Sequence, residues 1–206
     1  SAGLKGRRQL PMPKSWPDAV ARLRSNPRPD PDLTTLTQSL AVTFGDPNAL
    51  RELRQVLTTA KHPRAERLAA LETLVSANDA ALPRVLRELL IENSIRSEVI
   101  RAMAAFDDPA NFDRLVEVYP SLGMPEKRQA LATLSSRRTA AIRLLRAIAD
   151  RKIPATDVPA DLIRQLTNLR DPEIDKQIAA HWGVVRRTPG DRTQQMAHYR
   201  QMILKP

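Results

Sequence analysis

Apolar residues recur three and four positions apart in one short segment after another, which is the spacing of a helix face that packs against a neighbour. The segments run from Leu33 to Ile203. Leu, Ala and Arg, all strong helix formers, dominate the composition, whereas aromatic residues make up only 3%. No alternation of apolar and polar residues is long enough to indicate a strand. The sequence therefore predicts an all-α protein.

Short polar stretches, at which one helix is expected to end and the next to begin, separate these segments. An aspartate before a proline offers a capping carboxylate followed by a residue suited to the first helical turn. Helix starts are expected at Asp46-Pro47, His62-Pro63, Asn93-Ser94, Asp108-Pro109 and Asp171-Pro172. The expected product is about twelve helices of roughly 10–14 residues, joined by short turns.

A repeated pattern links three of the helices: a basic residue is followed by apolar residues four and seven positions later. The matches are Arg67, Leu71, Leu74, then Arg96, Ile100, Met103, and then Lys127, Leu131, Leu134. The pattern favours a right-handed α-α superhelix of the HEAT or armadillo kind, although such repeats are usually somewhat longer. The alternative is an irregular helical bundle, because any amphipathic helix produces some matches. The regular helix length and the absence of a long crossover favour the superhelix.

Three regions are expected along the chain. Residues 1–14 form an extended lead-in, because Pro11 and Pro13 do not continue a helix. Residues 15–187 form the helical repeat domain. Residues 188–206 form a linker and a final helix leading toward a missing C-terminal domain, so the chain is expected to be an excised piece of a larger protein.

No catalytic or ligand-binding constellation is visible. The chain has no cysteine, which excludes covalent haem and thiolate metal sites within it. His62, His181 and His198 lack a second ligand at metal-binding spacing. Asp107-Asp108, the densest acidic pair, is interpreted as a helix cap rather than a catalytic dyad. We therefore expect no catalytic residue, no cofactor and no metal ligand.

The formal net charge of +10 is spread along the chain. The densest basic cluster, which is a candidate partner-facing surface, consists of Arg137, Arg138, Arg143 and Arg146; Arg186-Arg187 is a second. Such a cluster can meet a carboxylate-rich partner or a phosphate. The alternative is a solvated helix face in which Arg146 pairs with Asp150 one turn later.

Three stretches resemble the helical repeat region of large bacterial proteins described as Pirellula/Verrucomicrobium-type membrane-bound dehydrogenase or haem-binding proteins. The first is Leu10-Pro11-Met12-Pro13 with Trp16 and Phe44-Gly45-Asp46. The second is Arg128-Gln129-Ala130-Leu131 through Ser136-Arg137-Arg138, with Leu144-Leu145-Arg146-Ala147-Ile148. The third is Arg164-Gln165-Leu166, Asn168-Leu169, His181-Trp182-Gly183 and Tyr199-Arg200.

The resemblance implies a context for the chain. In that family a β-propeller related to sugar dehydrogenases precedes the helical repeats, and a c-type cytochrome domain with a C-x-x-C-H motif follows them. No catalytic or haem residue carries over to this sequence. The expected role is a non-catalytic scaffold whose partners are neighbouring domains of the same parent, in a periplasmic or membrane-associated setting. No apolar run approaches the roughly 20 residues of a membrane-spanning helix.

The alternative function is a HEAT-like DNA-binding protein or an alkylpurine DNA glycosylase-type repair enzyme, which the net charge favours. Such an enzyme needs aromatic side chains and a carboxylate around one basic cleft. Here Trp16 and Trp182 lie at opposite ends of the sequence, and Trp182 continues the apolar face of Ile174 and Ile178, so a core position is expected for it. Nucleic acid is therefore the less favoured partner.

Overall fold

A computed structural model describes residues 12–25 and 30–183. These residues form eleven α-helices and two short 3₁₀ helices, with no strand among them, which confirms the all-α prediction. The last helix expected from the sequence, within residues 188–206, lies outside the described residues, as does most of the expected lead-in. No described helix has the length and apolarity needed to cross a membrane.

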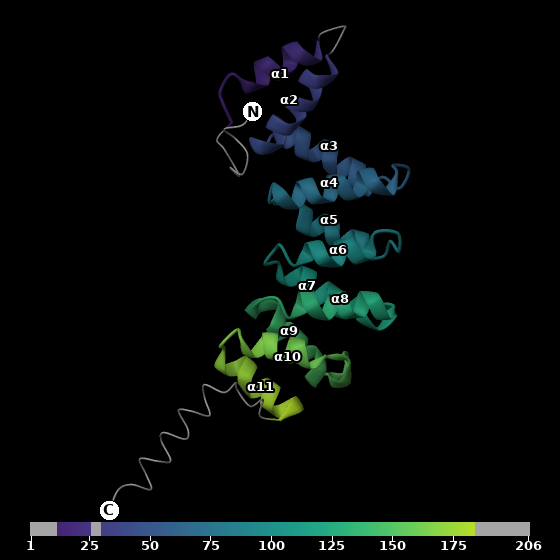
Figure 1. The fold of residues 1–206 in the computed structure, drawn as a ribbon, viewed down its shortest axis with the longest axis vertical. Helices are drawn as coiled ribbons and strands as arrows, with labels where there is room; N and C mark the ends of the chain where they lie inside the picture. Colours follow the sequence, from purple (N-terminus) through teal and green to yellow (C-terminus); the bar gives the residue numbers. More distant parts are fainter. Residues whose placement is uncertain (1–11, 26–29, 184–206) are drawn as a thin grey trace, which may run out of the picture. The chain divides into compact units, whose positions relative to one another are not determined.

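The chain divides into two compact units, one up to Leu134 and one from Ser135 onward. The elements of the first unit, seen in Figure 1, are α1 (Trp16–Arg24), α2 (Pro31–Thr43), α3 (Pro47–Thr58), α4 (Arg64–Ser76), α5 (Leu82–Leu89), α6 (Arg96–Met103), α7 (Pro109–Val118), η2 (Tyr119–Ser121) and α8 (Met124–Leu134). The elements of the second unit are α9 (Arg138–Ala149), η3 (Ala155–Asp157), α10 (Ala160–Thr167) and α11 (Pro172–Trp182).

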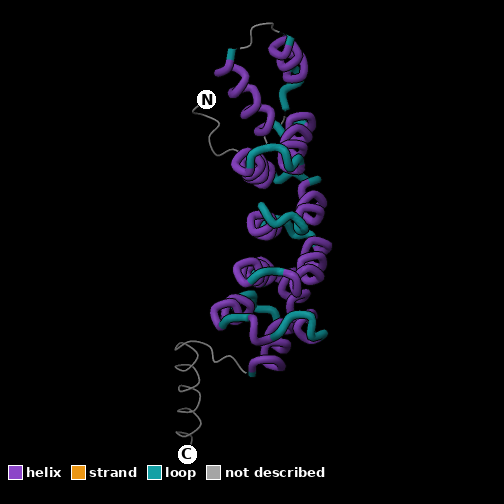
Figure 2. The backbone as a smooth tube through the Cα atoms, turned by 90° about the vertical axis from the view of Figure 1, so that its right-hand side faces the viewer, coloured by secondary structure: helices purple, strands orange, loops and turns teal. Residues whose placement is uncertain are grey.

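Helices of the first unit pack in two neighbouring rows. Consecutive helices contact each other within the pairs α3–α4 and α5–α6. In addition, α3 contacts α5 and α5 contacts α7, while α4 contacts α6 and α6 contacts α8. The odd row (α3, α5, α7) and the even row (α4, α6, α8) can be followed in Figures 1 and 2. Helices α5 and α6 are therefore covered by each other and by the equivalent helices of the adjoining pairs on both sides.

The core of the first unit lies between the two rows and contains the apolar positions of the repeated pattern. Leu74, Ile100, Met103 and Leu134 are fully buried, and Leu71 and Leu131 are nearly so. Phe112 of α7 and Tyr119 of η2 are the largest fully buried side chains. The pattern found in the sequence thus identified the residues that face the core.

The capping predictions are confirmed at all three Asp-Pro pairs. Asp46, Asp108 and Asp171 each accept a hydrogen bond from the backbone N–H two residues later, at 2.9, 2.9 and 3.0 Å. Asp30 caps α2 in the same way, at 2.9 Å. Each bond satisfies a donor that the helix itself leaves without a partner.

The cap expected at Asn93-Ser94 is wrong. Helix α6 has Ile95 at its N-cap, without a side-chain cap, and the Ser94 hydroxyl donates to Glu92 at 3.0 Å instead. Ile95 is fully buried. Placing this apolar side chain in the core moves the helix start one residue past the polar pair that the sequence offered.

In the second unit α11 packs against α9 and α10. Ile174 and Ile178 are buried as expected. Trp182, which was expected in the core, is only partly buried at the end of α11, where its indole N–H donates to the Ala155 carbonyl at 3.1 Å. Its ring also lies edge-on to His181, with the centroids 5.7 Å apart. A polar N–H that needs an acceptor holds this side chain at the margin of the apolar interior.

Candidate interaction surface

The basic residue of the repeated pattern joins helix pairs together. Arg67, in the first turn of α4, is only 3% exposed. Its Nε donates to the Leu57 carbonyl in the last turn of α3 at 2.8 Å. Its two terminal nitrogens donate to the two carboxylate oxygens of Glu92, which lies in the turn between α5 and α6; the Nη2–Oε2 distance is 2.7 Å. One side chain therefore connects both helices of its own pair to the next pair.

The equivalent arginine of the following pair occupies the same place, whereas the equivalent lysine of the third pair makes a different contact. Arg96 of α6 donates through Nε to the Leu90 carbonyl at the end of α5, at 2.6 Å, and its Nη1 lies 3.5 Å from both Glu126 carboxylate oxygens of α8. The Lys127 ammonium of α8 lies over the Tyr119 ring, 5.3 Å from its centroid. At Arg67 and Arg96 the pattern is thus a repeated inter-helix joint, a role that its sequence spacing alone does not specify.

A second series of contacts joins the helices of the odd row, and sequence analysis missed it. Arg54 of α3 donates to both oxygens of Asp79, which precedes α5, at 2.7 Å. Arg87 of α5 donates to Asp108, the cap of α7, at 2.7 Å. Asp46 and Arg54 are eight residues apart, as are Asp79 and Arg87, and the set recurs after 33 residues. This spacing is the sequence signal that would have revealed the joint.

The capping carboxylates of Asp46 and Asp171 also receive a donor from an earlier helix. The indole N–H of Trp16 in α1 donates to Asp46 at 3.0 Å, and Arg138 of α9 donates to Asp171 of α11. Asp108, half of the Asp107-Asp108 pair, therefore belongs to a set of caps that each serve two helices.

These contacts change the acidity of two carboxyl groups. The hydrogen bond from Arg67 lowers the pKa of Glu92 below its ordinary value, and Glu92 in turn raises the pKa of Arg67. The hydrogen bond from Arg138, together with the backbone N–H groups of α11, lowers the pKa of Asp171. In each case the ionised carboxylate is the form that accepts the bonds.

Stability is therefore expected to fall in acid. A carboxyl group with a depressed pKa in the folded state contributes fully above its unfolded pKa, about 4.3 for Glu and 3.9 for Asp, and loses that contribution as the pH falls through the folded value. Urea midpoints from pH 7 to about pH 3 should thus decline below about pH 4. For the first unit of the Glu92→Gln variant, the urea midpoint should be lower than in wild type at pH 7. It should also decline less steeply as the pH falls. An equally steep decline in wild type and variant would contradict this account.

The candidate cluster Arg137, Arg138, Arg143 and Arg146 is not a set of four free cations. Arg138 holds Asp171, and Arg143 donates to the Thr139 carbonyl one turn earlier, at 3.1 Å. Arg137 is the half-buried N-cap of α9, while Arg146 is exposed. The expected Arg146–Asp150 ion pair does not occur in the described structure. Arg186-Arg187 lies outside the described residues.

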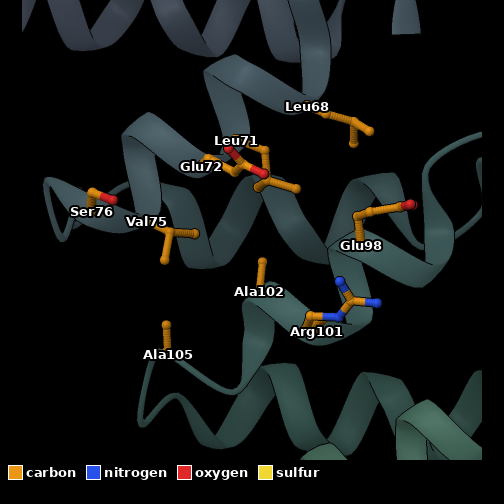
Figure 3. Close-up of a pocket in the computed structure, with 9 residues that line it drawn as sticks. All are labelled: Leu68, Leu71, Glu72, Val75, Ser76, Glu98, Arg101, Ala102 and Ala105. Atoms are coloured by element: carbon orange, nitrogen blue, oxygen red, sulfur yellow. The ribbon is translucent and has the colours of Figure 1, made fainter. Parts of the chain in front are cut away.

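A groove opens on the even row, between α4 and α6 (Figure 3). Its volume is about 420 Å³, and it is lined by Leu68, Leu71, Glu72, Val75, Ser76, Glu98, Arg101, Ala102 and Ala105. The groove exists because Ala102 on α6 and Ala105 in the turn after it have small side chains, which leave space beside Val75. These alanines, which lie beside Ile100 and Met103 of the repeated pattern, are the sequence signal for it.

The groove combines an apolar floor with charged walls. Leu71 and Ala102 are buried at its base. Glu98 is held by Arg64 at 2.6 Å. Glu72 on α4 and Arg101 on α6 are exposed, and neither forms an ion pair with another described residue. The groove therefore offers one unpaired carboxylate and one unpaired guanidinium on opposite walls.

Catalytic geometry is not visible in the described residues. They contain no group of three or more His, Asp or Glu side chains placed to hold a metal. His62 lies 3.2 Å from Glu66, one turn later, and His198 lies outside the described residues. The Trp16 ring packs edge-to-face on Phe44, with centroids 4.9 Å apart, and Tyr119 is buried. These aromatic side chains serve packing rather than an open base-binding cleft.

Comparisons of the chain with protein-family models, with curated protein sequences and with solved structures find no match. What the chain does is therefore inferred from its own residues.

Proposed function

We propose that this chain is a non-catalytic scaffold that binds other proteins, built as a right-handed α-α superhelix of the HEAT kind. The observation that carries the proposal is the joint repeated at Arg67 and Arg96, each of which binds a carbonyl of its own helix pair and a glutamate of the next pair. Arrays in which each pair contacts only its neighbours present long surfaces to partners. An array of this kind can act by binding alone, without an active site of its own.

A protein is a better fit than nucleic acid for the exposed even row. Its accessible positions include Glu72, Arg101 and Arg128, which are of mixed sign, beside an apolar groove. Protein interfaces combine an apolar centre with a polar rim of both charges. Surfaces that bind nucleic acid instead carry a stripe or patch of basic residues.

The resemblance described from the sequence extends the proposal to the partners. Neighbouring domains of an extracytoplasmic dehydrogenase and c-type cytochrome protein are the partners it implies. In that arrangement the helical repeats hold a catalytic domain and an electron-accepting domain in a fixed relation.

Site-specific photo-crosslinking in the cell of origin tests the scaffold. A photoreactive amino acid replaces exposed Arg128 on the even row, and a matched variant carries it at Arg84 on α5, which is 81% exposed. We expect discrete adducts with other protein domains from position 128 and not from 84. Adducts at neither position, or equal adducts at both, would count against a binding surface on the even row.

Titration with duplex DNA tests the alternative function. At about 0.15 M salt we expect only weak, sequence-independent binding, with a Kd above about 1 µM and a steep loss at higher salt. Specific sub-micromolar binding, or release of a base from alkylated DNA, would replace the scaffold with the repair function.

A further inference from the structure

The two most exposed large apolar side chains in the described part of the chain belong to successive helix pairs. Ile91, in the turn between α5 and α6, is 72% exposed, and Met124, the first residue of α8, is 77% exposed. A single exposed apolar side chain is ordinary on a protein surface. Two that stand close together and are this exposed instead indicate a contact surface.

A series of hydrogen bonds holds the two positions close to each other. Arg96 donates through Nη2 to the Ile91 carbonyl at 3.1 Å, and its Nη1 lies 3.5 Å from both carboxylate oxygens of Glu126. The Glu126 carboxylate also accepts a bond from the N–H of Gly123, directly before Met124, at 3.0 Å. Ile91 and Met124 therefore project from two turns that are bonded to each other.

Both turns lie on one edge of the first unit. From α3 to α8, the turns within helix pairs lie at the right of this unit in Figure 1, and the turns between pairs lie at the left. We call the right-hand turns, with the first residues of the helix after each, the intra-pair edge, which comprises residues 59–67, 90–99 and 119–127. Arg64 donates to the Ser94 carbonyl at 2.8 Å and so joins the first of these segments to the second.

The two edges differ in the sign of their charge. The intra-pair edge contains five basic and four acidic residues, which are Lys61, Arg64, Arg67, Arg96 and Lys127 against Glu66, Glu92, Glu98 and Glu126. Its three arginines each bind one of these glutamates, while Lys61 is exposed at the tip of its turn. The turns of the opposite edge contain Asp79, Asp107 and Asp108 and no basic residue. The exposed apolar pair therefore stands on the edge that is the better suited to an anionic surface.

We propose that the intra-pair edge binds the surface of an anionic lipid bilayer. Ile91 and Met124 enter the boundary between headgroups and acyl chains, and Lys61 lies against the headgroup phosphates. Peripheral binding of this kind combines buried apolar area with attraction to anionic lipid. Side chains that project singly from turns need no complementary pocket in a fluid bilayer, whereas a protein partner would have to provide one. This inference goes beyond the proposed scaffold, whose binding surface is the even row.

The apolar and the electrostatic contributions are both needed. Burying one side chain as large as Ile91 or Met124 strengthens binding about 10-fold. A basic residue close to an anionic surface adds about 5-fold. At about 0.15 M salt the screening length is about 8 Å, so basic residues far from this edge contribute little, although the whole chain carries a net charge of +10.

Centrifugation of the purified full chain with lipid vesicles tests the proposal. At about 0.15 M salt the chain should sediment with vesicles of phosphatidylcholine and phosphatidylglycerol in equal parts, and it should bind at least about 5-fold more weakly to vesicles of phosphatidylcholine alone. About 1 M salt should weaken the binding to the anionic vesicles. A chain that stays in the supernatant beside the anionic vesicles overturns the proposal.

Replacing the exposed apolar pair separates insertion from attraction between charges alone. Ile91→Ser with Met124→Ser should weaken binding to the anionic vesicles at least about 10-fold. The matched control is Leu33→Ser with Leu36→Ser on α2, where the side chains are 47% and 43% exposed, and it should leave binding unchanged. Because all four side chains are exposed, helix content measured by circular dichroism should match wild type. Equal binding by wild type and the Ile91 and Met124 variant overturns the proposal.

Charge reversal tests the basic part of the edge. Lys61→Glu should weaken binding at least about 5-fold. Arg84 on α5 is 81% exposed and lies outside the edge, so Arg84→Glu should change binding by less than about 2-fold. Equal losses in the two variants would show that only the overall charge matters, and the assignment to this edge would then be wrong.

A fluorescent label reports insertion directly, because the chain has no cysteine of its own. Met124→Cys, labelled with an environment-sensitive fluorophore, should shift its emission to shorter wavelength on the anionic vesicles, and Arg84→Cys should not. If the chain does not bind vesicles and a photoreactive amino acid at position 124 forms adducts with proteins in the cell, the edge is a protein interface and the lipid proposal is overturned. Adducts from the even row at Arg128 are a separate result, so the two proposals fail independently.

Discussion

Replacing Phe112 by alanine is expected to lower the free energy of unfolding of the first unit by about 4 kcal/mol, the upper range for a large-to-small core substitution. Phe112 is 0% exposed and lies in α7, where the apolar faces of both rows meet. Removing the ring forfeits its transfer from water and leaves a cavity that packed helices fill only in part.

The two tryptophans allow each unit to be followed separately. The chain contains only Trp16 and Trp182, one in each unit. In a Trp182→Phe background, urea unfolding followed by Trp16 fluorescence reports on the first unit alone. The matched control is Ile91→Ala, at a side chain 72% exposed, which should change the free energy by no more than about 0.5 kcal/mol. A loss below about 1 kcal/mol for Phe112→Ala would mean that α7 does not form this core.

Replacing Arg67 by methionine is expected to lower the same free energy by about 3 kcal/mol, because removing one partner of a buried ion pair leaves the other uncompensated. The variant leaves the Leu57 carbonyl without its Arg67 donor and Glu92 without its counter-charge. Methionine preserves the apolar stem, so the loss reports on the polar contacts rather than on packing.

The control for Arg67 is an exposed arginine that also has an acidic partner. Arg84 lies 3.3 Å from Glu88, one turn later, with both side chains largely exposed. Arg84→Met should change the free energy by less than about 0.5 kcal/mol, as is usual for surface pairs. Equal losses for the two arginines, in the same Trp182→Phe background, would show that the repeated joint contributes no more than an ordinary surface pair.

Sequence reasoning succeeded where the interaction is local. The cap at Asp108 bonds an N–H two residues away, so the Asp-Pro pair contains everything that the contact needs. The buried helix faces could be predicted for the same reason, because helical spacing places Leu71 and Leu74 on one side of α4. These features depend on neighbours in sequence, whatever the rest of the chain does.

Reasoning from the sequence failed where partners are distant or where a feature is an empty space. Arg67 binds Glu92, 25 residues away in an irregular turn, and no local pattern indicates that pairing. Arg138 and Arg146 look like one cluster in the sequence, yet Arg138 is taken up by Asp171, 33 residues on. The groove arises from the small side chains of Ala102 and Ala105, and the space that a small side chain leaves depends on what packs opposite it.

The arginine–aspartate contacts of the odd row make the two ends of a helix pair chemically different. The pair that begins at Asp46 presents a carboxylate backward along the chain and Arg54 forward, and the next pair does the same with Asp79 and Arg87. Any duplicated pair would carry matching halves of the joint at its two ends. Its charges would match those of its neighbours, whereas a reversed pair would set like charges together. Duplication of one helix pair in the gene would therefore preserve the arginine–aspartate chemistry of this joint.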